Sequence, residues 1–171
     1  LDRRFDGWQR DQAWVADITY VPTGEGWLYL AAVMDLAGRR IVGWSMSENI
    51  DATLVCTALK SACWLRKPAK GLLVHTDRGS QYAGGRYRAL AAELGITMSM
   101  SRRANAWDNA PMESFFKTLK VERIHQVRYD TRAQARLDIV DWIEGWYNRQ
   151  RLHSANGFLP PVTWENARLA A

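Results

Sequence analysis

Apolar residues gather in three short stretches within the first 48 positions, and each stretch is rich in β-branched and aromatic residues. The pattern predicts three strands, at residues 12–22, 26–36 and 39–48. The segment "TGEG" joins the first two and is typical of a hairpin, and Ala37-Gly38 separates the second from the third. We expect these strands to form an antiparallel meander.

The apolar period then becomes helical. Residues 52–66 predict a helix capped by Asp51, and residues 84–94 predict another. Short apolar strands are expected at 72–77 and 96–100. Because helices precede both of these strands, we expect right-handed crossovers and parallel pairing.

Two further helices are predicted after a loop at 101–109. The first of them has four apolar residues at helical spacing, which should face the core: Met112, Phe115, Phe116 and Leu119. The second is long and covers 131–149. The fold class is therefore α/β, a five-stranded mixed sheet with three antiparallel strands, then parallel strands, flanked by helices. We interpret residues 1–11 as a linker or arm, 12–150 as the core, and 151–171 as a polar, turn-rich tail that packs on it.

Composition favours a single globular domain with an acidic partner. The 171 residues are 47% hydrophobic, with a net charge of +5 and a pI of about 9.5. This charge favours nucleic acid, although many basic proteins bind none. No apolar run approaches the roughly 20 residues that span a bilayer. Cys56 and Cys63 form no CxxC pair, and two thiols without a signal segment fit a reducing cytoplasm.

Three carboxylates stand out by position. Asp17 lies in the first predicted strand, Asp77 ends the fourth, and Glu113 lies in the first turn of the helix after the loop. If the fourth strand pairs with the first, Asp17 and Asp77 become neighbours, and the helix can bring Glu113 over them. Three close acids repel unless a cation neutralises them, and oxygen ligands without His or Cys suit Mg²⁺ or Mn²⁺. Two such ions roughly 4 Å apart can clamp a phosphodiester.

Each acid also has an ordinary interpretation by itself. Asp17 can bond a neighbouring backbone amide, Asp77 can cap a turn through Gly79, and Glu113 can favour the start of a helix. Glu113, Lys117 and Lys120 share one helix stripe, so the lysines are placed either to hold a DNA phosphate or to form an ion pair on a solvated face.

The motifs taken together resemble a known family, the DDE transposases of bacterial insertion sequences of the IS-three type. The catalytic part encoded by their second reading frame, which has a retroviral integrase-like core, is similar over about residues 8–165. The stretches that carry the resemblance are "WVADITYV", "GWLYLAAVMDL", "IVGWSMSE", "HTDRGSQY", "SMSRRANAWDNAPMESFFKTLKVE" and "YNRQRLHSANGFLPP". The 35 residues between Asp77 and Glu113 match the family's spacing of its last two acids.

The resemblance implies an RNase H-like fold and two Mg²⁺ (or Mn²⁺) ions held by Asp17, Asp77 and Glu113 when DNA is bound. It implies cleavage at transposon ends to free a 3′-OH, followed by strand transfer from that hydroxyl to another phosphodiester. It also implies DNA partners at both transposon ends and target, a homo-oligomer in the active complex, and a bacterial, nucleoid-associated location. The helix-turn-helix segments of the family lie upstream, in regions or a partner frame product that this sequence does not include.

The loop and its border supply further candidates for DNA binding. Arg102 and Arg103 are interpreted as phosphate contacts, against a solvated loop, and Trp107 as a base-stacking residue, against docking of the loop. Asp108 and Asn109 either cap the helix or contact DNA or the metal shell. Lys120 matches a basic position after the Glu of the family.

Several residues keep two interpretations. Asp35 is a structural turn acid or approaches the site, and His75 is a satisfied sheet histidine or orients Asp77. Arg151 and His153 hold DNA or close the long helix onto the core. Asn156 stands where relatives carry Leu, which weakens the expected packing of the tail.

Two other functions remain open. One is a nuclease of the same fold that uses water. The other is a catalytically silent DNA-binding or regulatory fragment.

Overall fold

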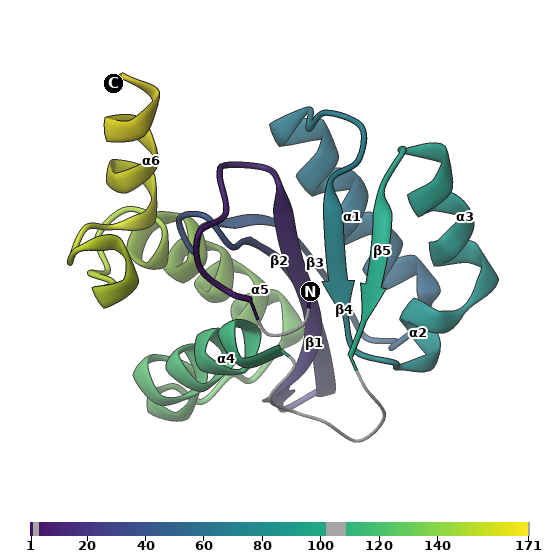
Figure 1. Ribbon diagram of the computed structural model, residues 1–171. Helices are drawn as coiled ribbons and strands as arrows, with labels where there is room; N and C mark the ends of the chain where they lie inside the picture. The colour runs from purple at the N-terminus through teal and green to yellow at the C-terminus, as the bar shows by residue number, and fades with distance from the viewer. Residues whose placement is uncertain (2–3, 102–108, 171) are drawn as a thin grey trace.

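The computed structural model describes residue 1, residues 4–101 and residues 109–170. Its centre is one sheet of five strands in the order β3-β2-β1-β4-β5 (Figure 1). The strands are β1 (Ala13–Thr23), β2 (Gly26–Asp35), β3 (Ile41–Ser47), β4 (Leu73–Thr76) and β5 (Thr97–Met100). The first three pair in antiparallel fashion, and β4 pairs in parallel with both β1 and β5. The predicted mixed sheet is confirmed.

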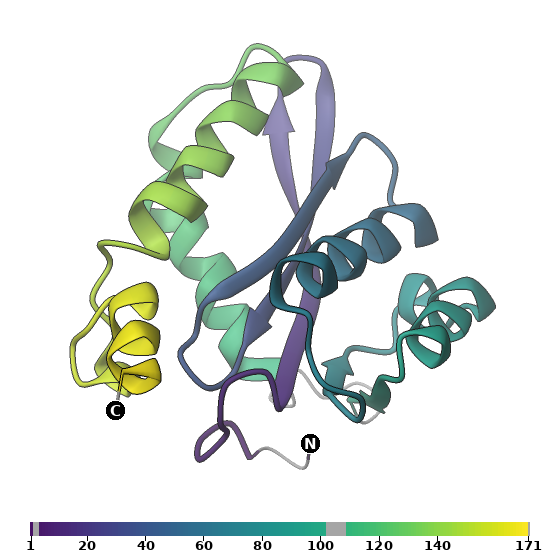
Figure 2. The same cartoon turned by 90° about the horizontal axis from the view of Figure 1, so that it is seen from above.

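Helices cover both faces of this sheet (Figure 2). On one face lie α1 (Ala52–Arg66), α2 (Ser80–Ala83) and α3 (Gly85–Glu93), and on the other lie α4 (Ala110–Glu122) and α5 (Arg132–Asp141). Two buried apolar clusters fill the spaces between these layers. Among the described residues, no helix has the length and apolar character needed to cross a membrane.

The cap of α1 and the buried face of α4 are as the sequence predicts. Asp51 caps α1 because its Oδ1 accepts a hydrogen bond from the Leu54 amide at 2.9 Å. α4 buries the four predicted residues Met112, Phe115, Phe116 and Leu119. α1 packs closely on β3 at Gly43. A Cβ added there would stand 2.6 Å from the Ala58 carbonyl oxygen, so this close approach requires glycine.

The long helix predicted over 131–149 is present from 132 to 147, but its winding changes in the second half. α5 ends at Asp141 and continues as a wider π-helical segment, η3 (Trp142–Tyr147). This segment delivers Asn148 to β3, where its side chain accepts from the Ile41 amide at 2.9 Å and donates to the Ile41 carbonyl at 3.0 Å. A short connection, η2 (Ile124–Gln126), joins α4 to the turn before α5.

The tail contains a helix that the turn-rich pattern did not predict. After η4 (Ser154–Asn156), α6 (Pro161–Leu169) begins with a proline in its first turn. Its buried residues are only Pro161 and Glu165, so it has no apolar stripe to recognise. The division into arm, core and tail stays a prediction.

Candidate active site

Asp17 and Asp77 come from neighbouring strands. β4 pairs with β1 so that Val15 lies beside His75, and Asp17 and Asp77 each follow this last pair by two residues. Asp77 stands directly after the end of β4 at Thr76, so both acids lie at the same end of the paired segment. The condition that the sequence left open, pairing of the fourth strand with the first, is met.

Asp17 is half-buried and has one hydrogen-bond donor, the Ile18 amide, at 2.8 Å from its Oδ1. Burial raises the pKa of Asp17 to about 7. The Ile18 hydrogen bond opposes this change, and the negative charges of Asp77 and Glu113 add to it. The three acids are therefore close enough to influence one another, although they come from β1, the end of β4 and α4.

Asp77 also has the ordinary role that its sequence suggests. Its Oδ1 accepts from the Gly79 amide at 2.9 Å, just before α2 begins. A Cβ added at Gly79 would lie 3.0 Å from that oxygen. The turn therefore fixes the carboxylate of Asp77 at the end of the sheet.

Glu113 lies on the solvent side of the first turn of α4. Lys117, one turn later, is exposed, whereas the Nζ of Lys120 lies 4.5 Å from the ring centre of Tyr20 on β1. The helix stripe predicted from the sequence thus has one free lysine and one that contacts the sheet.

The three acids suit a divalent cation in their chemistry, since all are oxygen donors of like charge. Among the described residues, however, no three His, Cys, Asp or Glu side chains stand close enough together to hold a metal ion. The shared metal site therefore stays a prediction.

Asn109 precedes α4, but its side chain caps no amide of that helix. It is 4% exposed, and its Nδ2 instead donates to the carbonyl of Ala16 at 3.2 Å, while its Oδ1 has no partner among the residues that the structure describes. The capping interpretation is wrong for this residue, and its predicted contact with DNA stays a prediction. Arg102, Arg103, Trp107 and Asp108 lie outside the described residues.

Two residues with open interpretations have structural contacts. His75 is buried, with Nδ1 2.8 Å from Ser99 Oγ and Nε2 3.1 Å from Ser101 Oγ, as expected of a satisfied sheet histidine. Asp35 accepts from the Ala37 amide at 3.1 Å, as expected of a structural turn acid.

The ends of α4 and η3 are joined by two residues of the tail. Arg151 forms an ion pair with Glu122, with 3.0 Å between Nη2 and Oε1. The His153 ring packs edge-on against the Tyr147 ring, with 4.8 Å between the ring centres. These contacts favour the interpretation that both residues close the structure.

A buried ionic group is the polar feature that the sequence analysis missed. The Arg66 guanidinium on α1 pairs with Asp11 at 2.8 Å, Asp35 at 3.1 Å and Glu165 at 2.6 Å. A signal was present, because Arg66 continues the stripe of Leu54, Ala58 and Ala62 in steps of four.

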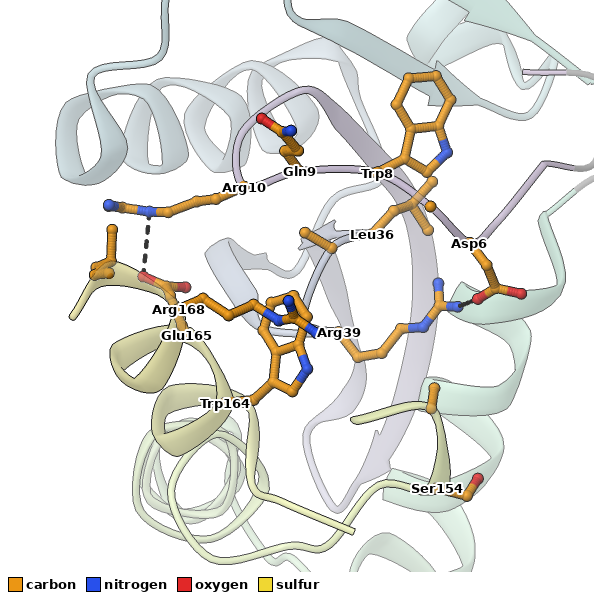
Figure 3. Close-up of a pocket in the computed structure, with 14 residues that line it drawn as sticks. Asp6, Trp8, Gln9, Arg10, Leu36, Arg39, Ser154, Trp164, Glu165 and Arg168 are labelled. Carbon is orange, nitrogen blue, oxygen red and sulfur yellow. Dashed lines mark hydrogen bonds and ion pairs between the residues drawn. The ribbon is translucent and has the colours of Figure 1, made fainter. Parts of the chain in front are cut away.

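A cavity near this ionic group is separate from the three acids. It has a volume of about 910 Å³ and lies between the arm, the turn after β2, and α6 (Figure 3). Arg39 pairs with Asp6 across one side of it, and Arg10 pairs with Glu165 at 3.3 Å on another. None of the three acids lines it.

The model of the Integrase core domain family matches residues 8–106, and a second model of the same description matches residues 94–161. The chain therefore belongs to the integrase core domain family. Its sequence is 44% identical over 165 residues to the transposase for insertion sequence element IS904 of Lactococcus lactis, and 45% identical over 170 residues to transposase InsF for insertion sequence IS3A of Escherichia coli. Over nearly its whole length, the sequence is thus similar to transposases of bacterial insertion sequences.

The matches cover 96% and 99% of this chain but only 65% and 59% of those relatives. The chain thus spans about three fifths of their length.

Solved structures share the fold at low sequence identity. An integrase from the simian T-cell lymphotropic virus intasome in complex with the PP2A regulatory subunit B56 gamma matches with a TM-score of 0.76, 15% identity, and coverage of 93% of this chain and 55% of that one. The HTLV-2 integrase catalytic core domain in complex with magnesium (dimeric form) matches with a TM-score of 0.63, 14% identity, and coverage of 88% and 94%. The sheet and its helices are therefore of the RNase H-like integrase type.

Proposed function

We propose that this chain cleaves DNA at transposon ends and joins the freed 3′ end to a target, with Asp17, Asp77 and Glu113 as its catalytic acids. The observation that carries the proposal is the parallel pairing of β4 with β1, which brings the segment just before Asp77 beside the strand that carries Asp17. The charges of Asp77 and Glu113, which add to the raised pKa of Asp17, support it. Of the three acids, only Asp17 and Asp77 are fixed by adjacent strands. The family of the chain and the order of the three acids along the sequence support the same assignment.

A divalent cation, Mg²⁺ or Mn²⁺, would supply the positive charge that polarises the phosphodiester and stabilises the leaving oxygen. Asp17 and Asp77 would hold it, and Glu113 would join them, with two ions in place when DNA is bound. The related HTLV-2 core in complex with magnesium supports this choice of metal. The free Lys117 next to Glu113 would bind a DNA phosphate.

The chemistry consists of two substitutions at phosphorus. In the first, water attacks the phosphorus at the transposon end, one P–O bond forms, and the broken P–O bond leaves a 3′-OH. In the second, that 3′ oxygen attacks a target phosphorus, and the displaced target oxygen takes up a proton as the hydroxyl of the attacker loses one. Asp17, Asp77 and Glu113 would hold the divalent cation, and the cation would supply the positive charge that orients and polarises the reacting phosphate.

The partners follow from the same proposal. They are transposon-end and target DNA, further copies of the chain in the active complex, and the missing upstream regions of the transposase. The intasome match and the partial coverage of the relatives support these partners. The protein would act in the bacterial cytoplasm, at the nucleoid.

The first test is a titration with Mn²⁺ followed by anomalous scattering from crystals. We expect manganese between Asp17 and Asp77, and its loss in Asp77→Asn. The matched control is Asp130→Asn. Asp130 lies in the turn before α5, and its side chain is 76% exposed. Wild-type protein without manganese at this position, at millimolar metal, would refute the proposed site.

One observation favours the alternative of a silent fragment: the described side chains form no complete ligand set. Adding the missing upstream part in trans separates the two ideas. Recovery of strand transfer supports the active core. Hydrolysis of DNA without any transfer of a supplied 3′-OH would instead support the nuclease.

A further inference from the structure

Asn109 joins the two elements that carry Asp17 and Glu113. Its Nδ2 donates to the carbonyl of Ala16, the residue directly before Asp17 on β1. Asn109 is also the residue directly before α4, whose first turn carries Glu113. In Figure 1 the start of α4 lies beside β1. The hydrogen bond of Asn109 therefore ties the beginning of the helix that carries Glu113 to the strand that carries Asp17.

The side chain is buried for more than nine tenths of its surface and is only half satisfied. Asn109 is 4% exposed, and its Oδ1 has no hydrogen-bond partner among the described residues. A buried amide oxygen without a partner has lost its hydrogen bonds to water without replacing them, so it calls for a physical explanation. The oxygen lies on a residue that touches the strand of Asp17, where polar ligands of the site would gather.

An unpaired amide oxygen alone does not define such a role. Asn156 is 3% exposed, donates from Nδ2 to the Gly38 carbonyl at 2.8 Å, and also has an unpaired Oδ1. It lies near the turn after β2, away from the three acids. The difference between the two residues is their place: only Asn109 bridges two elements that carry acids of the site.

We propose that Asn109 is a positioning residue of the active site, which fixes Glu113 relative to Asp17 through the Ala16 carbonyl. The inference rests on the proposed function. Its Oδ1 gains a partner when the site is filled, which favours the arrangement of α4 that the filled site requires. Residues that orient ligands from behind typically change metal affinity by about 10- to 100-fold.

The test compares the affinity of the chain for Mn²⁺, measured by electron paramagnetic resonance, in matched variants. We expect Asn109→Leu to raise the dissociation constant about tenfold. Asn156→Leu removes the same pair of amide groups, and it should leave the dissociation constant unchanged. Asn109→Ala, with the same expectation, replaces Asn109→Leu if leucine prevents folding.

A double-mutant cycle identifies the route of the effect. Because Asn109 acts through Glu113, Asn109→Leu should cause no further loss of affinity in a Glu113→Gln background. A full tenfold loss in that background, or equal losses in Asn109→Leu and Asn156→Leu, would overturn the inference.

The outcomes also separate the inference from the proposed function. Normal Mn²⁺ binding by Asn109→Leu, together with loss in Asp77→Asn, would reject the role of Asn109 and leave the metal site standing. Binding by Asp77→Asn with wild-type affinity would reject the metal site itself.

Discussion

Two groups of acids lie beside the sheet, and they differ in whether a cation of the protein neutralises them. Toward α1, Asp35 and Glu165 surround the Arg66 guanidinium, whose side chain is 1% exposed. Toward α4, Asp17 is coupled to Asp77 and Glu113, and no described lysine or arginine forms an ion pair with it. Burial raises the pKa in both places, to about 6 for Asp35 and about 7 for Asp17.

The difference teaches how to tell a structural acid from a catalytic one in this fold. The first group is complete within the protein, because a guanidinium provides charge and directional donors for several carboxylates at once. The second group is incomplete and needs charge from outside. Acids that the chain leaves without a cation are the ones that a metal ion can use.

The largest effect is expected from removing the cation of the Arg66 group, so that its acids, like Asp17, have no cation of the protein beside them. Arg66→Met keeps most of the buried volume but leaves Asp35 and Glu165 without their cation. We expect a loss of about 3–5 kcal/mol in the free energy of unfolding, measured with urea, because breaking a buried ion pair strands the remaining charges.

Arg128→Met is the control, since the Arg128 side chain is 95% exposed. It should change stability by less than about 0.5 kcal/mol. Similar values for the two variants would show that the ionic group contributes little to the fold.

The next effect concerns the group without a cation. The folded-state pKa of Asp17, about 7, lies above its ordinary value of 3.8, so the folded protein holds this proton more tightly. Asp17 therefore favours folding at low pH, and this contribution is lost as the pH rises from about 4 through about 7. Asp17→Asn should be more stable than wild type at pH 8, on the order of 2–4 kcal/mol, and equal to it near pH 4.

Urea unfolding at both pH values checks this prediction, and Mn²⁺ sharpens it. The metal should stabilise wild type at pH 8 but leave Asp17→Asn unchanged. Asp35 titrates in an overlapping range in both proteins, so only the difference between them reports Asp17. A variant less stable than wild type at pH 8 would contradict the assignment.

The smallest effect is expected on DNA affinity, and it tests whether the lysines of α4 bind DNA phosphates or only neutralise the nearby acids. Lys117 is exposed, so Lys117→Ala should weaken DNA binding for all sequences and reduce the slope of log affinity against log salt by about one. Lys120→Ala should change the slope less, because its ammonium group lies over Tyr20. Fluorescence anisotropy across a salt series measures both.

Lys60→Ala, an exposed lysine on α1, provides the control on the other face of the sheet. If its slope changes as much as that of Lys117→Ala, DNA binding is not localised to α4.

Much of the fold follows from the sequence because its signals are local. The apolar run before Asp77 and the strand composition around Asp17 predicted two strands, and the adjacency of the two acids needed only their parallel pairing. The helix α6 was missed because a buried Glu165 takes the place of an apolar stripe, and its partner Arg66 stands 99 residues away. Periodicity cannot reveal such a pair.

The site was predictable only in part, for a similar reason. The resemblance to the family makes Glu113 the proposed third acid, but its distance from Asp17 depends on how α4 docks. That docking uses Asn109, whose short polar side chain reads as a helix cap in sequence and donates instead to Ala16. The choice between these partners is made by tertiary contacts.

β1 is more than twice as long as β4, and the two pair only over residues 13–15 of β1. Within the described residues, β1 thus has a strand on both sides at its beginning and pairs only with β2 from Ala16 onward. Asp17 stands just past this change, where the side chain of Asn109 before α4 is bonded to the Ala16 carbonyl. Asp17 therefore has a fixed root in the sheet and, on its other flank, a helix held by a side chain instead of a ladder of backbone hydrogen bonds.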